Sequence, residues 1–307
     1  MAGDRNLRVA VSGASGLIGS KLVKRLQTEG HRVDRLVRDP SAKGEGKILW
    51  DPKGQTVDTK ALEGVDAVVH LAGENIAGGR WTEERKRQVL ESRVNGTKTL
   101  ASAAAKLENK PKVFVVASAI GYYGARGDEI LDEDSAPGDG FLSEVCRAWE
   151  QAAEPAEQAG IRVVKLRIGI VFAGSGGALA QMLPAFKLGA GGVLGDGKQY
   201  MSWVALEDVV GLARLALVDD RVRGAVNATA PTPVTNREFT KTLGKVIRRP
   251  TVLPVPSFAI KAMFGEMGDT LLLQGSRVVP KRAEALGYEF RYRELEGCLR
   301  GELLRSA

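Results

Sequence analysis

The sequence contains few of the residues that build metal centres and disulfide frameworks. Among its 307 residues there are two cysteines, Cys146 and Cys298, and two histidines, His31 and His70. Cysteines this far apart match neither a disulfide framework nor a zinc-ligand spacing, and neither histidine has a metal-binding partner nearby in the sequence. We therefore expect no metal site, and we expect His70 to be a satisfied residue at the end of a strand.

Long hydrophobic runs are also missing. No apolar run approaches the roughly 18 residues that a membrane-spanning helix requires, and residues 1–6 are polar rather than signal-like. Hydrophobic residues make up 44% of the chain and charged residues 26%, which is ordinary for a globular protein. The sequence therefore predicts no membrane partner and a cytoplasmic location.

No basic tract accompanies the formal net charge of +7. Nucleic-acid-binding proteins usually carry a basic stripe or a recognisable module, and this sequence has neither. We therefore expect no nucleic-acid partner, and we interpret the scattered positive charge as a mixed surface together with a site for phosphate groups.

The stretch from Leu7 to Leu26 combines a strand, a turn and a helix in that order. Residues 7–11 form an apolar run of strand length, and residues 18, 22 and 26 repeat as one face of a helix does. Glycines let a ligand approach the backbone closely, and a helix N-terminus attracts phosphate. This order predicts a dinucleotide site, the alternative being a turn that only packs helix on strand. The glycines between strand and helix are Gly13, Gly16 and Gly19.

The end of the second expected strand, residues 31–38, indicates which dinucleotide would bind. Folds that bind NAD commonly place an acid there for the ribose 2′-hydroxyl, whereas this chain has Val37 and Arg38. A guanidinium suits a 2′-phosphate, so Arg38 predicts NADP. The alternative is a surface arginine at the start of a loop. Of the rival acids, Asp34 lies too early in the strand, and Asp39 is expected in a turn.

Further buried strands alternate with helices along the chain, which predicts an α/β fold. Continuous apolar character marks strands over 66–71, 112–118 and 162–172. We expect a Rossmann-type doubly wound parallel sheet in residues 1–166, to which later strands from 167–230 return. Residues 167–307 should form a smaller α/β C-terminal lobe on the substrate side. Because ligands bind at the carboxyl ends of such strands, the cofactor should pass Leu71, Ala72, Gly73 and Glu74.

Several other segments carry specific expectations. A helix capped by Thr82 is expected over 81–107, where Gly96 costs about 1 kcal/mol relative to alanine and so indicates close packing. Within it Arg93 could reach a cofactor phosphate, or it lies on a solvated face. Thr235 and Glu238 predict a capping box for a helix over 236–247. The acidic segment 128–140 is either a mobile lid or a solvated loop.

Several motifs together resemble one subgroup of the short-chain dehydrogenase/reductase superfamily. The subgroup is the atypical "epimerase family", which has a C-terminal domain of unknown function. The similarity covers nearly the whole chain and implies an NADP-binding Rossmann fold. The motifs are SGASGLIG, LAGENI, SAIGYYG and GDTLLLQGSRVVPKR. The cofactor contacts that the resemblance implies are Gly13, Ser15, Gly16, Leu17, Ile18, Val37, Arg38, Leu71, Ala72 and Arg93.

The resemblance breaks at the superfamily's catalytic Tyr-x-x-x-Lys pair. On a helix expected over 141–159, the two positions are occupied by Leu142 and Cys146. Proton transfer must therefore use other groups. Ser118 stands at the position of the superfamily's catalytic Ser/Thr, and aromatic packing is the alternative role for the two tyrosines. The candidates are Ser118, Tyr122, Tyr123 and Glu144.

Two functions fit these expectations. The first is an NADP(H)-dependent oxidoreductase or epimerase that acts on a small polar substrate such as a nucleotide sugar. The second is a catalytically silent NADP(H)-binding redox sensor that acts through a protein partner, with segment 128–140 and the C-terminal tail as responsive surfaces. The oligomeric state stays open between a monomer and a homodimer.

Overall fold

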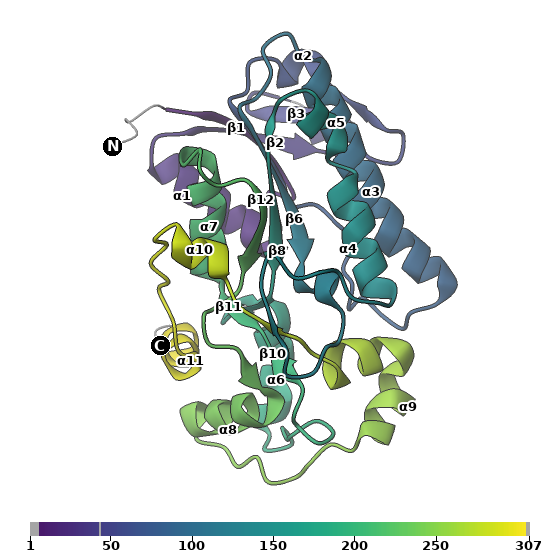
Figure 1. The fold of residues 1–307 in the computed structure, drawn as a ribbon, viewed down its shortest axis with the longest axis vertical. Helices are drawn as coiled ribbons and strands as arrows, with labels where there is room; N and C mark the ends of the chain where they lie inside the picture. Colours follow the sequence, from purple (N-terminus) through teal and green to yellow (C-terminus); the bar gives the residue numbers. More distant parts are fainter. Residues whose placement is uncertain (1–5, 43, 305–307) are drawn as a thin grey trace.

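An eight-stranded sheet forms the centre of the computed structural model, which describes residues 6–42 and 44–304 (Figure 1). Its strand order is β12-β8-β6-β5-β1-β2-β3-β4, and every neighbouring pair is parallel except β3 and β4. This sheet confirms the expected Rossmann-type α/β fold. Its strands are β1 (Arg8–Ser12), β2 (Arg32–Val37), β3 (Lys47–Asp51), β4 (Thr56–Val57), β5 (Ala67–His70), β6 (Val113–Ala119), β8 (Arg162–Ile168) and β12 (Gly224–Ala228).

The strand order reverses between β1 and β5, since the chain runs outward from β1 through β2 and β3 and then continues on the other side with β5 and β6. Such a reversal opens a crevice at the carboxyl ends of the two strands, where doubly wound sheets bind their ligands. The turn after β1 and the loop after β5 therefore meet at the place where a cofactor site is expected.

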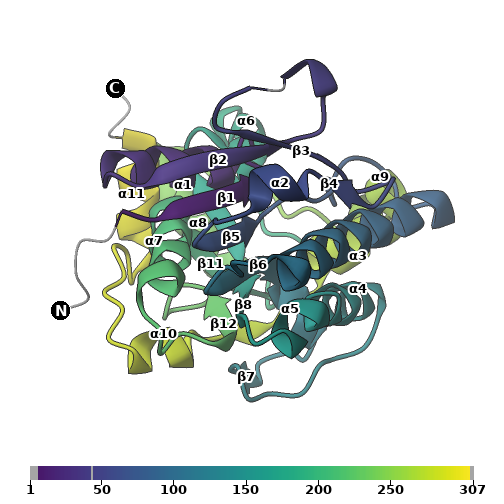
Figure 2. The same ribbon diagram turned by 90° about the horizontal axis from the view of Figure 1, so that it is seen from above.

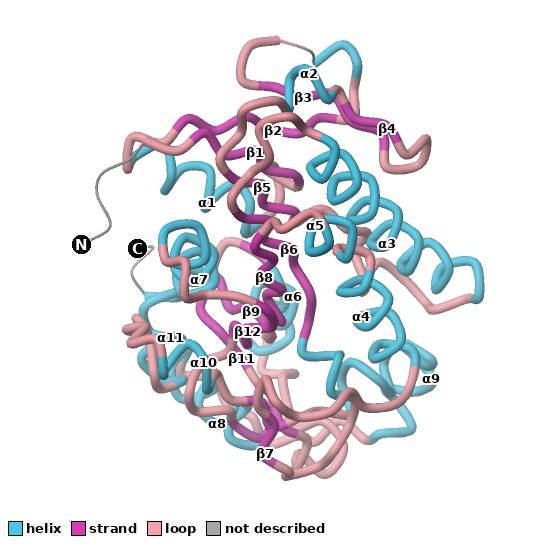
Figure 3. The backbone as a smooth tube through the Cα atoms, turned by 45° about the horizontal axis from the view of Figure 1, so that its top comes forward, coloured by secondary structure: helices cyan, strands magenta, loops and turns pink. Residues whose placement is uncertain are grey.

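Helices cover both faces of the sheet (Figure 2). On one face, α1 (Leu17–Thr28) and α7 (Leu206–Val218) pack together; on the other, α3 (Glu83–Lys106) contacts α4 (Phe141–Gln151) and α5 (Glu154–Gln158) (Figure 3). The pleat of β1 explains the division, because Val9 and Val11 point into the α1/α7 core whereas Ala10 points into the α3 core. The short α2 (Thr59–Leu62) precedes β5.

A smaller lobe has an aromatic core of its own. Phe172 stacks on Trp203, with ring centroids 6.0 Å apart, and also packs against Phe239. The lobe contains two short strand pairs, β9 with β11 and β10 with β13. Its elements are β9 (Ile170–Ala173), α6 (Gly177–Lys187), β10 (Tyr200–Met201), β11 (Trp203–Ala205), β13 (Val234–Thr235), α8 (Asn236–Ile247), α9 (Ser257–Gly268) and α11 (Leu295–Leu304).

Helix boundaries agree with the sequence where local signals are strong. Helix α8 spans the predicted residues, and the capping box of Thr235 with Glu238 is present. Thr82 caps α3 by accepting a hydrogen bond from the Arg85 amide. The expectation of a single helix over 141–159 is wrong, because α4 ends at Gln151 and a second helix, α5, begins at Glu154. Pro155 explains the break, since a proline ring clashes with the carbonyl four residues earlier and lacks an amide donor.

Candidate cofactor site and the adjoining polar cluster

The turn after β1 packs backbone against backbone. Gly13 has a φ of +67°, and a Cβ placed on it would lie 2.9 Å from the Ala72 amide nitrogen. A Cβ on Gly19 would lie only 2.1 Å from the Gly13 carbonyl oxygen. Neither position has room for a side chain, so the glycines bring the turn, the first turn of α1 and the loop after β5 into direct contact.

The N-terminus of α1 is open to a ligand. Gly16 is its N-cap and supplies no side-chain cap, and no acid lies in the first helical turn. The first amides of a helix have no partners within the helix and carry the positive end of its dipole. Ser15 and Gly16 are exposed, while Leu17 and Ile18 are half-buried beside them. The predicted pyrophosphate-binding residues therefore lie together at one helix end.

Arg38 lies exposed just beyond the end of β2, next to the half-buried Val37. Within the described residues it makes no hydrogen bond or ion pair. Asp34 is buried inside the strand and pairs with Arg8, whose Nε lies 2.6 Å from its Oδ2. Asp39 turns back to accept a hydrogen bond from the Ser41 amide. The guanidinium of Arg38 is thus the group that β2 presents at the edge of the site.

Arg93 lies beneath the loop that follows β5. It is 9% exposed, and it donates hydrogen bonds of 3.0 Å to the carbonyl oxygens of Val89 and Glu74. A Cβ on Gly73 would contact its guanidinium carbon at 3.5 Å, and the Trp149 ring lies on its other side. Arg93 is therefore not on a solvated face. Its hydrogen bond to the Glu74 carbonyl and its packing against Gly73 hold residues 73–74 in place.

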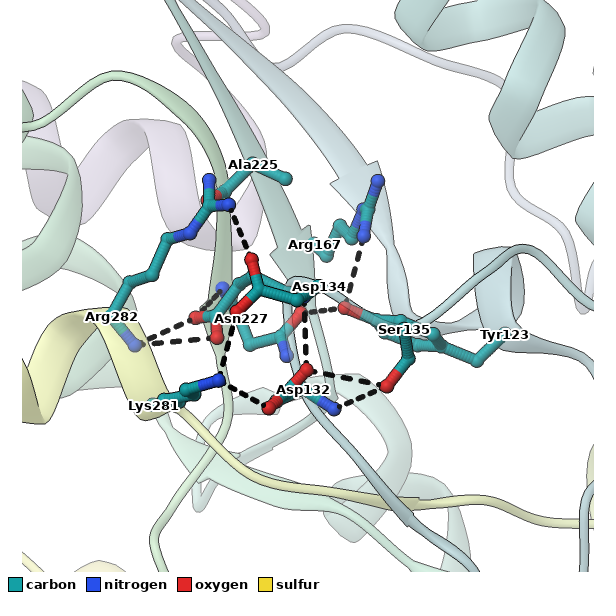
Figure 4. A network of polar contacts seen from close by, with 10 residues as sticks. Tyr123, Asp132, Asp134, Ser135, Arg167, Ala225, Asn227, Lys281 and Arg282 are labelled. Atoms are coloured by element: carbon teal, nitrogen blue, oxygen red, sulfur yellow. Dashed lines mark hydrogen bonds and ion pairs between the residues drawn. The ribbon is translucent and has the colours of Figure 1, made fainter.

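A buried polar cluster fills the carboxyl ends of β6, β8 and β12. Arg167 donates from Nε and Nη2 to the two oxygens of Glu150, at 2.8 and 3.0 Å, and from Nη1 to the Tyr123 hydroxyl at 3.0 Å. Ser118 donates to Glu150 Oε1 at 2.7 Å. The Tyr123 hydroxyl in turn donates to Asn227 Oδ1 at 2.7 Å (Figure 4).

These contacts separate the candidate hydroxyls. Ser118 is 2% exposed and Tyr123 is fully buried, and both hydroxyls are committed to neighbours within the cluster. Burial raises the pKa of Tyr123 to about 12. Tyr122 is half-buried, and within the described residues its hydroxyl makes no hydrogen bond. Of the three candidate hydroxyls, that of Tyr122 alone is not already engaged by other described residues.

The positions of the missing catalytic pair face this same segment. A Cβ on Gly121 would lie 3.1 Å from the Leu142 Cβ and 3.6 Å from the Cys146 Sγ. Burial raises the pKa of the Cys146 thiol to about 11, so it stays protonated near neutral pH. Glu144 is exposed on α4. An apolar side chain and a neutral thiol thus pack against Gly121, the residue before Tyr122.

The acidic segment 128–140 is fastened to the C-terminal tail. Its strand β7 (Ile130–Leu131) pairs with β14 (Arg277–Val278), and Lys281, at the start of α10 (Lys281–Ala285), contacts Asp132 and Asp134 at 2.9 and 2.8 Å (Figure 4). Its other attachment is Glu133, which is 6% exposed and accepts hydrogen bonds from backbone amides. These attachments argue against a mobile lid, while most residues of the segment are exposed, as the alternative of a solvated loop expects.

Glu133 and Asn227 are cluster members that the sequence did not reveal. Glu133 accepts a 2.9 Å hydrogen bond from the Asn227 amide and a 3.2 Å bond from the Arg282 amide. A polar residue inside the apolar strand of residues 224–228 was a usable signal for Asn227. Glu133 had no such signal, because four other acids surround it within residues 128–134.

Two further observations concern the described residues as a whole, 6–42 and 44–304. They contain no group of three histidines, cysteines or acids placed to hold a metal ion. None of their helices is both long enough and apolar enough to cross a membrane.

The sequence matches known families over most of its length. The model of the NAD dependent epimerase/dehydratase family matches residues 9–228, and a domain of unknown function matches residues 255–301. The chain belongs to the NAD-dependent epimerase/dehydratase family. An epimerase family protein of Mycobacterium tuberculosis is 43% identical over 294 residues, which cover 96% of this chain and 97% of the relative. Human epimerase family protein SDR39U1 is 38% identical over 298 residues, 96% of this chain and 99% of its own.

Solved structures of this family share both lobes. The crystal structure of human SDR39U1 with NADPH has a TM-score of 0.89 and 37% identity, and the match covers 97% of this chain and 99% of the human one. A nucleoside-diphosphate sugar epimerase from Corynebacterium glutamicum has a TM-score of 0.82 and 38% identity, with 98% of this chain and 59% of the other covered. The family resemblance drawn from the sequence motifs is thus confirmed.

Proposed function

We propose that this chain is an NADP(H)-dependent oxidoreductase or epimerase that acts on a small polar substrate. The observation that carries the proposal is the glycine turn, where Gly13 and Gly19 leave no space for a side chain and the N-terminus of α1 is open. The residues fit a dinucleotide, because free helix amides bind pyrophosphate and the exposed Arg38 suits a 2′-phosphate. When bound, NADP(H) supplies the hydride donor or acceptor.

The comparisons support the cofactor and the substrate class. Human SDR39U1, which matches nearly the whole chain, was crystallised with NADPH. The Corynebacterium glutamicum relative is described as a nucleoside-diphosphate sugar epimerase. We therefore place nucleotide sugars first among the substrates to test.

Tyr122 is our candidate for proton exchange with the substrate. It follows the carboxyl end of β6, where ligands of doubly wound sheets lie, and its hydroxyl is not engaged by other described residues. Ser118 and Tyr123 would hold the site together from beneath, since their hydroxyls are bound within the buried cluster. The guanidinium of Arg167 packs against the face of the Tyr122 ring.

A redox sensor is the second candidate. The apolar Leu142 and the protonated Cys146 at the positions of the usual catalytic pair favour it. In that case NADP⁺ and NADPH must bind with different affinities, because a ligand with equal affinity for two states shifts no equilibrium. Equal affinities, with no difference in protease protection between the two forms, would rule the sensor out.

The deciding experiment is a titration with NADPH, NADH, NADP⁺ and NAD⁺, followed by NADPH fluorescence or calorimetry. We expect a preference for the phosphorylated forms that Arg38→Asp abolishes. Arg35→Asp is the matched control, since it makes the same charge change at an exposed position of β2. If none of the four nucleotides binds, both functions fall. If NADPH binds, its oxidation with a panel of nucleotide sugars and other carbonyl compounds tests the enzyme.

A further inference from the structure

A serine and a histidine meet in the buried space beneath the glycine turn. Ser12 ends β1 and His70 ends β5, and both side chains are fully buried. The Ser12 Oγ lies 2.6 Å from His70 Nδ1. The same oxygen lies 3.2 Å from the Leu71 amide nitrogen and 3.3 Å from that of Ala72. Ser12 therefore links the turn after β1 to the loop after β5.

The hydrogen bonds assign the state of both side chains. A serine hydroxyl has two acceptor positions and one proton. The amides of Leu71 and Ala72 occupy the acceptor positions, so the Ser12 proton must go to His70 Nδ1. His70 is then the neutral tautomer with its proton on Nε2. Full burial of the ring agrees with this state, because it lowers the pKa of His70 to about 3.

The far edge of the His70 ring faces α3. Within the described residues, its Nε2 is buried and has no hydrogen-bond partner. A Cβ on Gly96 would lie 3.2 Å from both Cε1 and Nε2 of the ring. The Trp50 indole stands at 87° to the imidazole, with the centroids 5.7 Å apart. Gly96 therefore gives the ring the space that it needs to reach Ser12.

The amides that Ser12 holds are the ones on which the glycine turn rests. A Cβ on Gly13 would touch the Ala72 nitrogen and the Leu71 carbonyl carbon, each at 2.9 Å. A shift of a few tenths of an ångström at residues 71–72 must therefore pass to Gly13 and the N-terminus of α1. This is the surface that, in the proposed function, meets the dinucleotide.

We propose that Ser12 and His70 are positioning residues for the dinucleotide, and that Gly96 on α3 sets the place of the His70 ring. This inference rests on the proposed function, because it concerns the same site. The hydroxyl of Ser12 fixes the amides of residues 71–72, and the imidazole fixes the hydroxyl. Neither side chain needs to touch the nucleotide, so loss of the pair should change NADPH affinity without removing a direct contact.

The first test measures the NADPH dissociation constant of single variants. Ser12→Ala and His70→Leu should each weaken binding about tenfold, the size expected for one lost buried hydrogen bond. His70→Asn keeps a polar atom near the place of Nδ1 and should bind within about twofold of the wild type. Leu217→Ala is the control, because it opens a cavity in α7 within the main core and leaves the pair intact.

The second test is a double-mutant cycle. Gly96→Ala should weaken NADPH binding severalfold in the wild type, because the new methyl group presses on the ring. In the His70→Asn background it should have no effect, since asparagine has no atoms at Cε1 and Nε2. If His70→Leu does not fold, this cycle and Ser12→Ala still decide the question.

Selective ¹⁵N labelling of the histidine rings, followed by NMR, shows which nitrogen of His70 is protonated and does not depend on binding affinity. With two histidines in the chain, the ring signals are simple to assign, and His70 should show protonation at Nε2 near neutral pH. Protonation at Nδ1 would contradict the inference. So would wild-type affinity in folded Ser12→Ala and His70→Leu, or an equal effect of Gly96→Ala in both backgrounds. If the wild type binds no dinucleotide, the proposed function itself fails and this inference falls with it.

Discussion

The guanidinium of Arg167 lies against the ring of Tyr122, with its carbon Cζ 3.4 Å from the ring centroid. The same guanidinium donates hydrogen bonds to both carboxylate oxygens of Glu150 and to the Tyr123 hydroxyl. Although burial opposes it, the hydrogen bonds and charge of Glu150 raise the pKa of Arg167. One cation thus joins the proposed proton-exchanging tyrosine to the buried core of the sheet edge.

Replacing this cation should destabilise the fold strongly. Arg167→Leu leaves the Glu150 carboxylate buried at 7% exposure without its partner, and removing one member of a buried pair typically costs about 3–5 kcal/mol. Urea unfolding measures the loss. The control is Arg300→Leu, which breaks an exposed pair with Glu296 and should cost less than about 1 kcal/mol. Equal losses in the two variants would contradict a structural role for the Arg167 cluster.

Gly19→Ala should abolish dinucleotide binding. Its Cβ would lie 2.1 Å from the Gly13 carbonyl oxygen, and the three nearest atoms are all backbone atoms, which cannot rotate away. The turn must move, so we expect NADPH affinity to fall at least about tenfold, or about 1.4 kcal/mol. Gly44→Ala is the matched control, because no described atom lies within 4 Å of its Cβ. Undiminished binding by Gly19→Ala would show that the close approach at Gly13 has no part in holding the nucleotide.

Local signals explain why so much of the architecture was predictable. The glycines at 13, 16 and 19 and the apolar strands act within a few residues of their own position, and so does the capping box at Thr235. The close packing expected at Gly96 is present, against the His70 ring. The turn glycines, the strands and the capping box depend on steric limits or hydrogen bonds near their own place in the chain, whereas at Gly96 the sequence indicated the close packing but not its partner.

The polar cluster could not be predicted in the same way. Ser118 and Glu150 are 32 residues apart, and the Glu133 carboxylate meets the Asn227 amide over 94 residues. A short sequence motif does not predict such pairings, because they form only when β6, β8 and β12 lie side by side in the folded sheet. For this reason Ser118 and Tyr123 look like reactive groups in the motif, although the fold commits both hydroxyls to buried partners.

Glu133 should make stability depend on pH. Burial raises its pKa from the ordinary 4.5, although the amides of Asn227 and Arg282 act in the opposite direction. The folded state therefore holds the proton to a higher pH than the unfolded state, and stability falls as the pH rises through this window. Glu133→Gln removes the dependence. We expect the melting temperature of the variant, relative to that of the wild type, to increase from pH 4.5 to pH 7.

Glu296→Gln provides a control of opposite sign. Its hydrogen bonds with Lys245 and Arg300 lower the pKa of Glu296, so its contribution to stability is lost as the pH falls. That variant should lose ground to the wild type as the pH rises toward 4.5, which is below the window of Glu133. If both variants change in the same direction, burial of Glu133 does not set its titration.

His70 should make the protein sensitive to acid in a way that a single substitution removes. Burial lowers its pKa from 6.5 to about 3, so the unfolded chain binds a proton below about pH 6.5 that the folded chain does not. Stability therefore falls by about 1.4 kcal/mol per pH unit below 6.5, or about 2 kcal/mol at pH 5. Urea unfolding at pH 8 and pH 5 should show this loss in the wild type and in Leu217→Ala, but not in His70→Asn. A full loss in His70→Asn would assign the acid sensitivity to other groups.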